Sequence, residues 1–383
     1  MKPILSIQNE ELILQRYPAR ENDTLQAWDS ADEYLINTLA ERNLDPTRPI
    51  LIFNDSFGAL SNWLSTRGCI YNISDSFIAQ QACRENLKEN AKASINYLNC
   101  RDSLPKNPQA VIIKIPKNNR LLKWQLDQIA QVVSADCDVI AGAKTKEIHT
   151  STLRLFEQKL GETHTSLAVK KSRLIFCRPN SHRPSNPSTE QATIWSVPEY
   201  NFTLFNHVNV FAGEKLDIGA RFFLEHLPQD PAAEHIIDLG CGNGVIGLQC
   251  ARLNPDARVT CVDESDMAVA SARENADRNL TNPDQLNAMM NNCLTGMQPE
   301  TADWVVCNPP FHQQNTITDH IAWQMFCDAK HVLKMKGKLR IIGNRHLGYH
   351  VKLKRLFGNV TTIASNNKFV ILEAEKRPTR TTS

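Results

Sequence analysis

The sequence predicts an α/β protein built from two tandem domains of similar architecture, each with a largely parallel sheet at its centre. Its 383 residues exceed the ~150 that are typical of one domain. Short β-favouring runs alternate with helical stretches in the carboxyl-terminal half, an order typical of parallel sheets covered by helices on both faces. Local sequence matches also recur in the same order in both halves. We therefore expect domains over residues 1–178 and 193–377, joined by a linker over residues 179–192.

The linker is predicted from composition. Residues 178–188 read Arg-Pro-Asn-Ser-His-Arg-Pro-Ser-Asn-Pro-Ser, in which prolines and small polar residues predominate. On either side of it, four ordered matches indicate a tandem duplication. They are Asp75-Ser76 with Asp263-Glu264, Arg84-Glu85-Asn86 plus Asn90 with Arg273-Glu274-Asn275 plus Asn279, residues 113–116 with 307–310, and residues 141–149 with 342–350.

Residue spacing predicts the elements of the second half in chain order. The predicted strands are His235–Leu239, Arg258–Asp263, Trp304–Cys307 and Lys338–Gly343. Apolar residues three and four apart predict helices over Val245–Leu253, Met267–Asn279 and Ile321–Leu333. Two further β-like stretches, Val360–Ala364 and Phe369–Leu372, predict an antiparallel hairpin at the end of the sheet.

Composition excludes several classes of protein. Hydrophobic residues make up 42% and charged residues 22%, enough for two ordered cores. No apolar run approaches the ~18 residues of a membrane helix, and the start of the chain has no signal-peptide pattern. The eleven cysteines are scattered without a CxxC pair, which favours buried thiols in a reducing compartment over a zinc site. We expect a cytoplasmic protein with no membrane partner and no metal.

Charge is unevenly distributed although the net charge is only +2. Residues 330–355 contain Lys and Arg but no Asp or Glu, a pattern that suits phosphate binding. We predict a phosphate-binding rim made of six cations: Lys334, Lys336, Lys338, Lys352, Lys354 and Arg355.

A glycine-rich loop joins the first strand and helix of the second half. Residues 237–247 read Ile-Asp-Leu-Gly-Cys-Gly-Asn-Gly-Val-Ile-Gly, and such glycines allow a tight turn and close approach of a ligand. Gly242, Gly244 and Gly247 also fit GxGxxG, so a nicotinamide dehydrogenase is an alternative. The acidic Asp238 instead gives the pattern D-x-G-x-G-x-G.

The tetrapeptide Asn308-Pro309-Pro310-Phe311 follows the fourth predicted strand. Two prolines cannot continue a central strand, and their fixed φ makes a rigid shelf. The side-chain oxygen of Asn308 and the carbonyl of Pro309 can each accept one N–H of a planar amino group, and Phe311 can stack on the ring that carries it. The tetrapeptide resembles the Asn-Pro-Pro-aromatic motif of methyltransferases that act on planar NH₂ groups. The resemblance implies that these contacts turn the nitrogen lone pair towards a methyl donor, and a dehydrogenase leaves the motif unexplained.

With these motifs, the sequence resembles class I S-adenosyl-L-methionine-dependent methyltransferases. From about residue 12 to 375 it resembles the bacterial ribosomal RNA guanine-N2 methyltransferases, the RsmC/RlmG family. The resemblance implies two tandem Rossmann-like class I methyltransferase domains, the first of them degenerate. It implies methylation of the exocyclic N2 of one guanine, and an amino-terminal domain that helps to bind RNA. Residues 208–219, 262–268 and 366–370 look most like the type that modifies large-subunit (23S) RNA.

The family also implies the roles of the cofactor-binding residues. Asp238 and the glycines Gly240, Gly242 and Gly244 would lie along the methionine moiety, Asp263 would bind the ribose hydroxyls, and Asn292 would contact the adenine ring. Positioning would supply most of the acceleration, so no metal is required. We expect a monomer.

The first half lacks both the glycine-rich loop and the Asn-Pro-Pro-Phe motif. Residues 53–59, Phe-Asn-Asp-Ser-Phe-Gly-Ala, stand in for the glycine loop, and Lys114-Ile115-Pro116-Lys117 stands in for the shelf. A lysine cannot accept the N–H of an amine. Eight cations of this half suit a polyanion such as RNA: Lys114, Lys117, Arg120, Lys144, Lys146, Lys170, Lys171 and Arg173.

Three alternatives remain open besides the dehydrogenase. A small-subunit (16S) guanine-N2 methyltransferase shares the same motifs. A protein-glutamine methyltransferase also presents an amide to an Asn-Pro-Pro-aromatic shelf, although that family usually carries Tyr in place of Phe311. A non-enzymatic RNA-binding protein would not need Asp238, Asp263 or Asn308.

Overall fold

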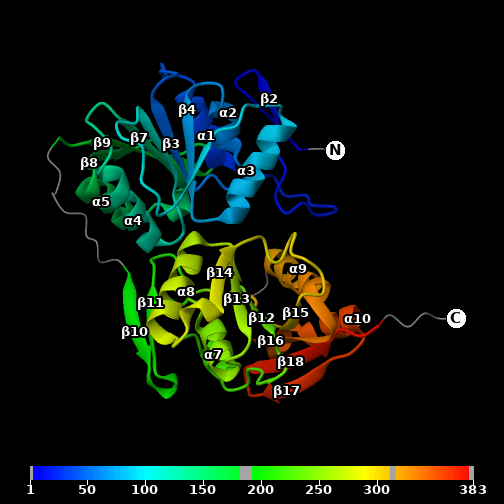
Figure 1. Cartoon of the computed structure of the whole chain (residues 1–383). Coiled ribbons are helices and arrows are strands. Elements are labelled where there is room, and N and C mark those ends of the chain that lie inside the picture. The colour runs from blue at the N-terminus through cyan, green and yellow to red at the C-terminus, as the bar shows by residue number, and fades with distance from the viewer. Residues whose placement is uncertain (1–2, 182–191, 311–315, 379–383) are drawn as a thin grey trace. The chain divides into compact units, whose positions relative to one another are not determined.

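The computed structural model describes residues 3–181, 192–310 and 316–378, with the backbone alone for 316–318. The chain divides into two compact units, Met1–Gln191 and Ala192–Ser383 (Figure 1). Most of the predicted linker, residues 182–191, lies outside the described residues.

The first unit begins with an antiparallel hairpin and continues as an α/β sheet. Its strands are β1 (Ile4–Ile7), β2 (Glu10–Ile13), β3 (Pro49–Phe53), β4 (Cys69–Ser74), β5 (Asn96–Asn99), β6 (Ala110–Lys114), β7 (Asp138–Lys144), β8 (Gly161–Thr165) and β9 (Ser172–Pro179). Its helices are α1 (Ser30–Leu39), α2 (Ala59–Leu64), α3 (Phe77–Glu89), α4 (Asn119–Ala130) and α5 (Thr150–Lys159), with a short 3₁₀ turn, η1 (Thr145–Glu147).

The second unit repeats this plan. Its strands are β10 (Thr193–Val197), β11 (Phe202–Asn206), β12 (His235–Leu239), β13 (Arg258–Asp263), β14 (Leu286–Met290), β15 (Ala302–Cys307), β16 (Leu333–Asn344), β17 (Thr361–Ser365) and β18 (Phe369–Glu375). Its helices are α6 (Ile218–Leu224), α7 (Val245–Leu253), α8 (Asp266–Asn279), α9 (Thr316–Val332) and α10 (Tyr349–Phe357), with 3₁₀ turns η2 (Pro198–Tyr200), η3 (Pro283–Gln285) and η4 (Arg345–Leu347).

Both large sheets have the same topology. The strand orders are β5-β4-β3-β6-β7-β9-β8 and β14-β13-β12-β15-β16-β18-β17. The first five strands of each order are parallel, and an antiparallel pair closes the sheet. The prediction of two tandem α/β domains with a closing hairpin is therefore confirmed.

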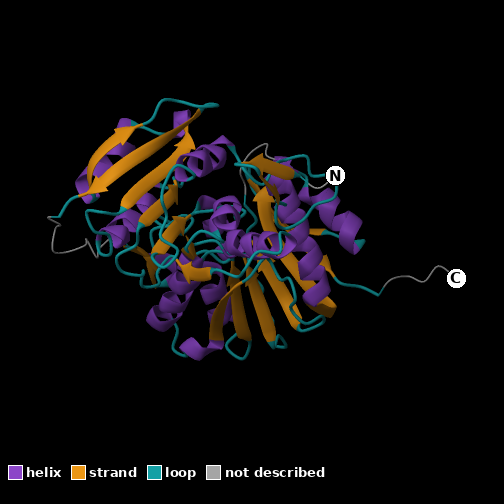
Figure 2. Ribbon diagram, turned by 90° about the horizontal axis from the view of Figure 1, so that it is seen from above, coloured by secondary structure: helices purple, strands orange, loops and turns teal. Residues whose placement is uncertain are grey.

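Helices cover both faces of each sheet (Figure 2). In the second unit, α6, α7 and α8 share a core cluster with one face of the sheet, and α9 and α10 share a second cluster with the other face. Because both faces of a parallel strand are buried, its polar residues gather where the strand ends. The ends of the strands are therefore the places where chemistry is possible.

Strand register identifies equivalent residues of the two units. In the first unit, Phe53 ends β3 and pairs with Ile73 and Ile113. In the second unit, Leu239 ends β12 and pairs with Val262 and Cys307. Ile113 is therefore equivalent to Cys307. Lys114 comes directly after Ile113, and Asn308 directly after Cys307. Lys114 therefore occupies the place of Asn308, as the sequence predicts.

Three predicted equivalences are wrong by one residue. Gly58 begins α2 as Gly244 begins α7, and Ser74 ends β4 as Asp263 ends β13. Lys144 ends β7 where Asn344 ends β16. The errors arise because the connections between equivalent strands differ in length, so no single offset aligns the units.

The repeated asparagines clamp the hairpin that precedes each sheet. Asn275 accepts from the amide of Phe205 and donates to its carbonyl, at 2.7 and 2.9 Å, and Asn279 holds Thr203 in the same way. Asn86 and Asn90 bind Gln15 and Ile13 identically in the first unit. Each side-chain amide thus pairs with the backbone N–H and C=O of one hairpin residue, as a neighbouring strand would.

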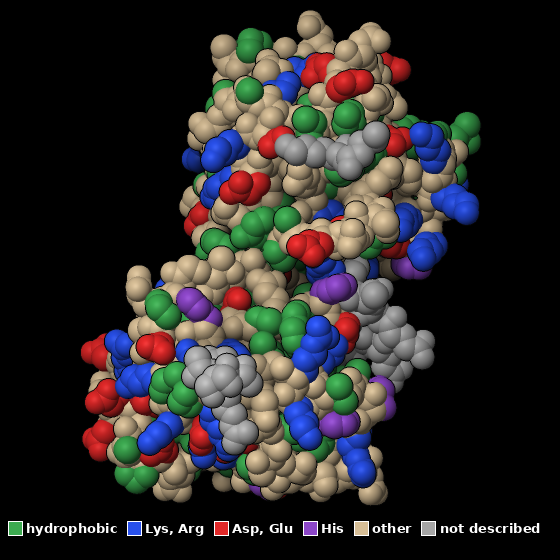
Figure 3. All heavy atoms as spheres, turned by 90° about the vertical axis from the view of Figure 1, so that its right-hand side faces the viewer, with side chains coloured by type: hydrophobic (Ala, Val, Ile, Leu, Met, Phe, Trp, Pro, Cys, Tyr) green, Lys and Arg blue, Asp and Glu red, His purple; other side chains and the backbone are tan. Residues whose placement is uncertain are grey.

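Composition predictions on thiols and charge can be compared with the structure. All eleven cysteines are free, and most are buried. Within the described ranges, no helix is long and apolar enough to cross a membrane. On the face drawn in Figure 3, Lys and Arg side chains lie among Asp and Glu, in keeping with 43 basic and 41 acidic residues.

Candidate active site

The predicted site residues that the structure describes lie at one edge of the second sheet. β14, β13, β12 and β15 lie side by side and parallel in this order. Their carboxyl ends are followed by Asn292, by Asp263 itself, by the loop 240–244 and by Asn308. Chain order reverses at β12, whose neighbours are β13 and β15. In open α/β sheets, ligands bind in the crevice at such a switch point.

The glycine loop has a backbone that only glycine adopts easily. Gly240, Gly242 and Gly244 have φ of 73°, 53° and 84°. A Cβ on Gly244 would lie 2.9 Å from the Cβ of Ala272, so this glycine also allows α7 and α8 to pack closely. A Cβ on Gly242 would meet nothing within 4 Å. The loop therefore has open space at Gly242, where a ligand can approach the backbone, and in this respect it fits the predicted cofactor.

Asp238 lies beneath the loop rather than on its surface. It is 2% exposed, and its Oδ2 accepts the amide hydrogen of Gly247 at 2.9 Å. Burial, reinforced by the charge of Asp263, raises the pKa of Asp238 to about 7. This bond fastens the first turn of α7 to β12. Its direct contact with a cofactor stays a prediction.

We expect Asp238→Asn to flatten the dependence of stability on pH. Because the folded pKa of about 7 lies above the ordinary 3.8, the contribution of Asp238 to stability is complete below about pH 4 and is lost as the pH rises through 7. Asparagine keeps an acceptor for Gly247 and does not ionise. Thermal melting between about pH 4 and pH 8 measures the difference. Asp284→Asn, at an exposed position on η3, is the control; equal pH profiles for Asp238→Asn and the wild type would contradict the prediction.

Asp263 presents a fixed carboxylate beside the loop. Its Oδ2 accepts from the amide of Gly242 at 2.9 Å, and its Oδ1 accepts from the amide of Ser265 at 3.0 Å. Burial raises the pKa of this carboxyl above its usual value. The two bonds hold its oxygens next to the glycine loop, where the predicted ribose contact would be made. Its equivalent in the first unit is Ser74, which has no carboxylate.

Asn292 is also held in a defined orientation. It is 3% exposed, and its Oδ1 accepts from Nε2 of Gln324 on α9 at 3.1 Å. The side-chain oxygen of Asn291 accepts from the backbone amide of Asn292 at 2.8 Å. These bonds place Asn292 next to the carboxyl end of β13, where the predicted adenine contact would be made. That contact stays a prediction.

Asn308 carries the clearest sign of a ligand. Its Oδ1 is buried and accepts no hydrogen bond from any residue that the structure describes. A buried acceptor without a donor costs about 1–3 kcal/mol, so such atoms in folded proteins call for a specific explanation. The next residue, Pro309, is buried and offers only its carbonyl, because proline has no N–H. Phe311, the last residue of the predicted shelf, lies outside the described residues.

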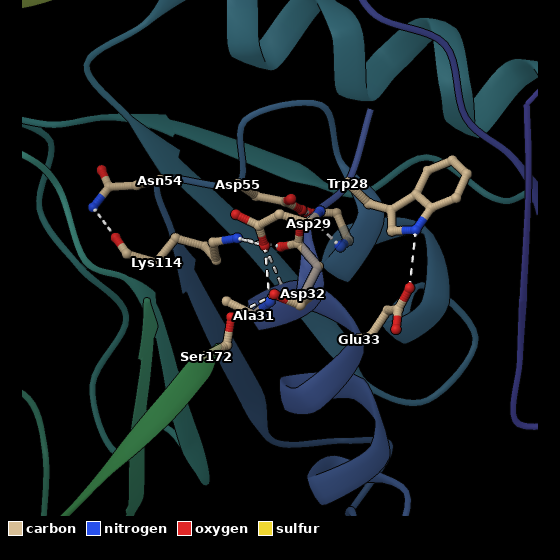
Figure 4. Close-up of polar contacts among 11 residues, drawn as sticks. Trp28, Asp29, Ala31, Asp32, Glu33, Asn54, Asp55, Lys114 and Ser172 are labelled. Atoms are coloured by element: carbon tan, nitrogen blue, oxygen red, sulfur yellow. Dashed lines mark hydrogen bonds and ion pairs between the residues drawn. The ribbon is translucent and has the colours of Figure 1, made fainter. Parts of the chain in front are cut away.

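The first unit has filled the equivalent position with an ion pair. Nζ of Lys114 lies 2.7 Å from Oδ1 of Asp29 and 2.8 Å from Oδ1 of Asp32, and the lysine side chain is 13% exposed (Figure 4). Asp55 lies beside this group and accepts from the amide and hydroxyl of Ser61. The prediction that Lys114 binds a polyanion is therefore wrong, because its charge is already compensated within the fold.

The predicted phosphate rim is also wrong in part. Lys334, Lys336 and Lys338 lie at the amino end of β16, the edge opposite the candidate site. Lys334 pairs with Asp303 and Lys338 with Glu373, each at 3.1 Å. Most of the acid-free segment forms β16, so the residues at its start and end lie at opposite edges of the sheet. The other three predicted cations lie on α10, where Lys352 pairs with Asp319 at 2.9 Å and Lys354 and Arg355 belong to the last turn.

Sequence analysis did not identify Asn344. This residue ends β16, the strand beside β15, and is 9% exposed. Its Oδ1 is buried and, like that of Asn308, accepts no hydrogen bond within the described parts of the chain. The available signal was its position, because a polar residue at the carboxyl end of a parallel strand lies at the ligand-binding edge.

The thiol of Cys241 in the glycine loop does not provide a nucleophile. A hydrogen bond with Cys261, together with burial, raises the pKa of Cys241 well above its ordinary value, so the thiolate does not form at neutral pH. Among the residues that the structure describes, no group of His, Cys, Asp and Glu is arranged to hold a metal ion.

Comparisons with known proteins agree with this architecture. The family model described as "RLMG N-terminal domain" matches residues 2–181, and the one described as "Methyltransferase small domain" matches residues 201–373. Ribosomal RNA large subunit methyltransferase G of Photobacterium profundum is 58% identical over 376 residues, 98% of this chain and 100% of the relative. The protein of the same name from Vibrio vulnificus is 54% identical over 378 residues, again 98% and 100% of the two chains.

A solved structure shows the same fold. The 16S rRNA N2 methyltransferase RsmC of T. thermophilus, in complex with AdoMet and guanosine, matches with a TM-score of 0.77 at 20% identity. The match covers 98% of this chain and 98% of that one, so it includes both units.

Proposed function

The chain belongs to the ribosomal RNA large subunit methyltransferase G family, and we propose from this that it transfers a methyl group from S-adenosyl-L-methionine to the exocyclic N2 of one guanine in 23S ribosomal RNA. The unpartnered Oδ1 of Asn308, at the switch point of the sheet beside the glycine loop, is the observation that carries the proposal.

The residues of the chain account for activation of the amine. The N2 of guanine is a poor nucleophile because its lone pair is delocalised into the ring. Asn308 Oδ1 and the carbonyl of Pro309 would each accept one N2–H, which favours a tetrahedral nitrogen and directs the lone pair away from the shelf. When bound along the glycine loop, S-adenosyl-L-methionine supplies an activated methyl group. Alignment of the two groups provides most of the rate enhancement, and the proton leaves to water after transfer.

The guanine must be outside a helical stack to enter this site. A paired guanine uses its N2 in base pairing, and the surrounding helix blocks access to it. The enzyme would therefore act on an unpaired or extruded guanine. The cofactor and the base would then lie side by side along the carboxyl edge of the sheet. Asn292, Asp263 and the glycine loop would contact the cofactor, and Asn308 would contact the base.

The first unit supports RNA binding through one edge of its sheet. Lys117, Lys144, Lys146 and Lys171 lie near the carboxyl ends of β6 and β7, and all four are exposed. Within the described ranges none of them forms an ion pair, whereas the nearby Lys170 pairs with Glu33 at 2.7 Å. We refer to these four residues as the lysine edge. Unpaired lysines along one edge suit an RNA backbone.

We propose that the enzyme acts in the cytoplasm as a monomer. The acceptor Asn308, the carboxylate Asp263 and the glycine loop all belong to the second unit of one chain, which supports a monomer. Large-subunit specificity is inferred from the relatives' names, since the small-subunit enzyme shares the fold.

Methyl transfer to isolated ribosomal RNA tests the function. The purified protein and tritiated S-adenosyl-L-methionine are incubated with 23S and 16S RNA from a strain that lacks the protein, and the labelled nucleotide is then mapped. We expect label on N2 of one guanine of 23S RNA. Label in 16S RNA alone would favour the small-subunit alternative, and label in a protein glutamine would favour the protein-modifying one. Label in neither RNA, whether naked or in ribosomal subunits, would refute the proposal.

A further inference from the structure

We propose that Asn344 selects guanine in this site by accepting the N1–H of the base whose N2 amino group is held by Asn308. The inference rests on the proposed function and adds a specificity-determining residue to it. Guanine carries its N1–H and its N2 amino group on one edge, so two neighbouring acceptors match that edge. Adenine has no amino group at C2, and its N1 is an acceptor.

The two asparagines lie at one edge of the sheet on neighbouring strands. Cys307 of β15 pairs with Ile341 of β16, so Asn308 lies level with residue 342, and Asn344 follows two residues later. Both strands are parallel, and both asparagines therefore lie at the carboxyl edge. A separation of one strand and two residues spans about 7–8 Å between backbones, which two side chains can bridge by reaching towards one base.

Strand alternation directs both side chains to the same face. Trp304 and Val306 of β15 belong to the core cluster with Ile342 of β16, so even-numbered residues of both strands face α6, α7 and α8. Asn344 continues this alternation and pairs with Phe369, which belongs to the same cluster. Asn308 follows Val306 in the same alternation at the end of β15.

Asn344 has the hydrogen-bonding state of a ligand-binding residue. Its oxygen is buried and, among the described residues, no group donates a hydrogen bond to it, as is also true of Asn308. By contrast, Asn359 is a structural asparagine of the same unit, whose oxygen accepts from the amide of Glu375 at 2.9 Å and whose nitrogen donates to two carbonyls. An acceptor that contributes nothing to the fold is available to a base.

The duplicated unit gives an independent argument. Lys114 stands in the place of Asn308, and Lys144 stands in the place of Asn344, paired with Ser172 as Asn344 is paired with Phe369. Both acceptors of the catalytic unit are thus cations in the unit that lacks the glycine loop. Neither lysine can accept an N–H. The first unit therefore lacks both acceptors, and the second unit has both.

The test compares guanine with 2,6-diaminopurine, which keeps the N2 amino group but has no N1–H. The substrates are two RNA oligonucleotides that span the labelled guanine of the mapping experiment, one with guanine and one with 2,6-diaminopurine at that position. We expect the wild type to prefer guanine in kcat/KM by about 10- to 100-fold. We expect Asn344→Ala to lower guanine methylation and reduce this preference to about twofold or less. Asn344→Asp keeps an acceptor and should preserve most of the preference.

The outcomes separate this inference from the proposed function. If the wild type methylates neither oligonucleotide and also does not methylate the RNA from which they derive, the proposed function is refuted. If the wild type is active, an unchanged preference in Asn344→Ala would overturn the role of Asn344, because a purely structural role lowers both rates equally. Asn287→Ala, on exposed edge strand β14, is the control and should match the wild type. Calorimetric binding of S-adenosyl-L-methionine to Asn344→Ala establishes that the variant is folded.

Discussion

Alanine in place of Asn308 lowers the rate of methyl transfer by about 100- to 1,000-fold, the loss expected when one preorganised hydrogen-bonding group is removed from a reacting centre. The variant keeps the glycine loop and Asp263, so S-adenosyl-L-methionine still binds. The oxygen of Asn308 accepts no hydrogen bond within the described part of the fold, so its removal breaks no hydrogen bond made by that atom. Single-turnover transfer of a tritiated methyl group to 23S RNA measures the rate, and calorimetry measures cofactor binding.

A matched variant separates chemistry from folding. Asn287→Ala makes the same chemical change at an exposed position of β14, the edge strand of the same sheet, and should retain the wild-type rate. An Asn308→Ala protein that transfers methyl groups within about threefold of the wild type would refute the role of the shelf. Loss of both cofactor binding and thermal stability would instead identify Asn308 as a structural residue.

Charge reversal of the lysine edge weakens RNA binding without affecting the cofactor. With all four lysines changed to Glu, we expect the affinity for 23S RNA to fall on the order of a hundredfold at physiological salt. If these lysines bind single-stranded RNA, the slope of log affinity against log salt should become shallower by about 0.7 for each phosphate that is no longer neutralised. Binding of S-adenosyl-L-methionine should not change, because its proposed ligands all lie in the second unit. Filter binding over a salt series measures both effects.

The control for this prediction reverses equal charge elsewhere on the first unit. Lys88→Glu with Lys106→Glu places the changes at exposed positions near the amino end of the sheet, and Lys144→Glu with Lys171→Glu places them on the lysine edge. The second pair should weaken binding much more than the first. Equal reductions in affinity would show that only net charge matters, and the lysine edge would then not be the binding surface.

Sequence patterns predict much of the second unit because local rules govern it. The bounds of β12, β13 and α7 agree with the predicted ranges, since each element lies between strong local signals such as the glycine loop. The same signals place Asp263 and Asn308 at strand ends. The carboxyl ends of parallel strands share one edge, so their proximity follows from the order of elements alone.

The errors come from contacts between residues far apart in sequence. Lys114 resembles a surface cation, but it is compensated by Asp29 and Asp32, more than 80 residues away. The cations of residues 334–338 follow Asn308 in sequence, yet they lie at the amino end of a strand of twelve residues, which places them at the opposite edge. Asn344 was not identified because its significance depends on the burial of one oxygen, which a sequence does not show.

The salt bridge of Lys114 makes the inactivity of the first unit hard to reverse in evolution. Mutation of this lysine alone would leave the buried Asp32, whose side chain is 9% exposed, without its counter-ion, which destabilises the fold, whereas Asp29 is 41% exposed and solvated by water. If Asp29 or Asp32 is mutated first, the other aspartate still pairs with Lys114. Position 114 then still has no hydrogen-bond acceptor. A return to catalysis would also need a carboxylate at Ser74, so every single-step route passes through an intermediate that is less stable or still inactive. The ion pair therefore favours retention of Lys114, and a return to catalysis would need several substitutions rather than one.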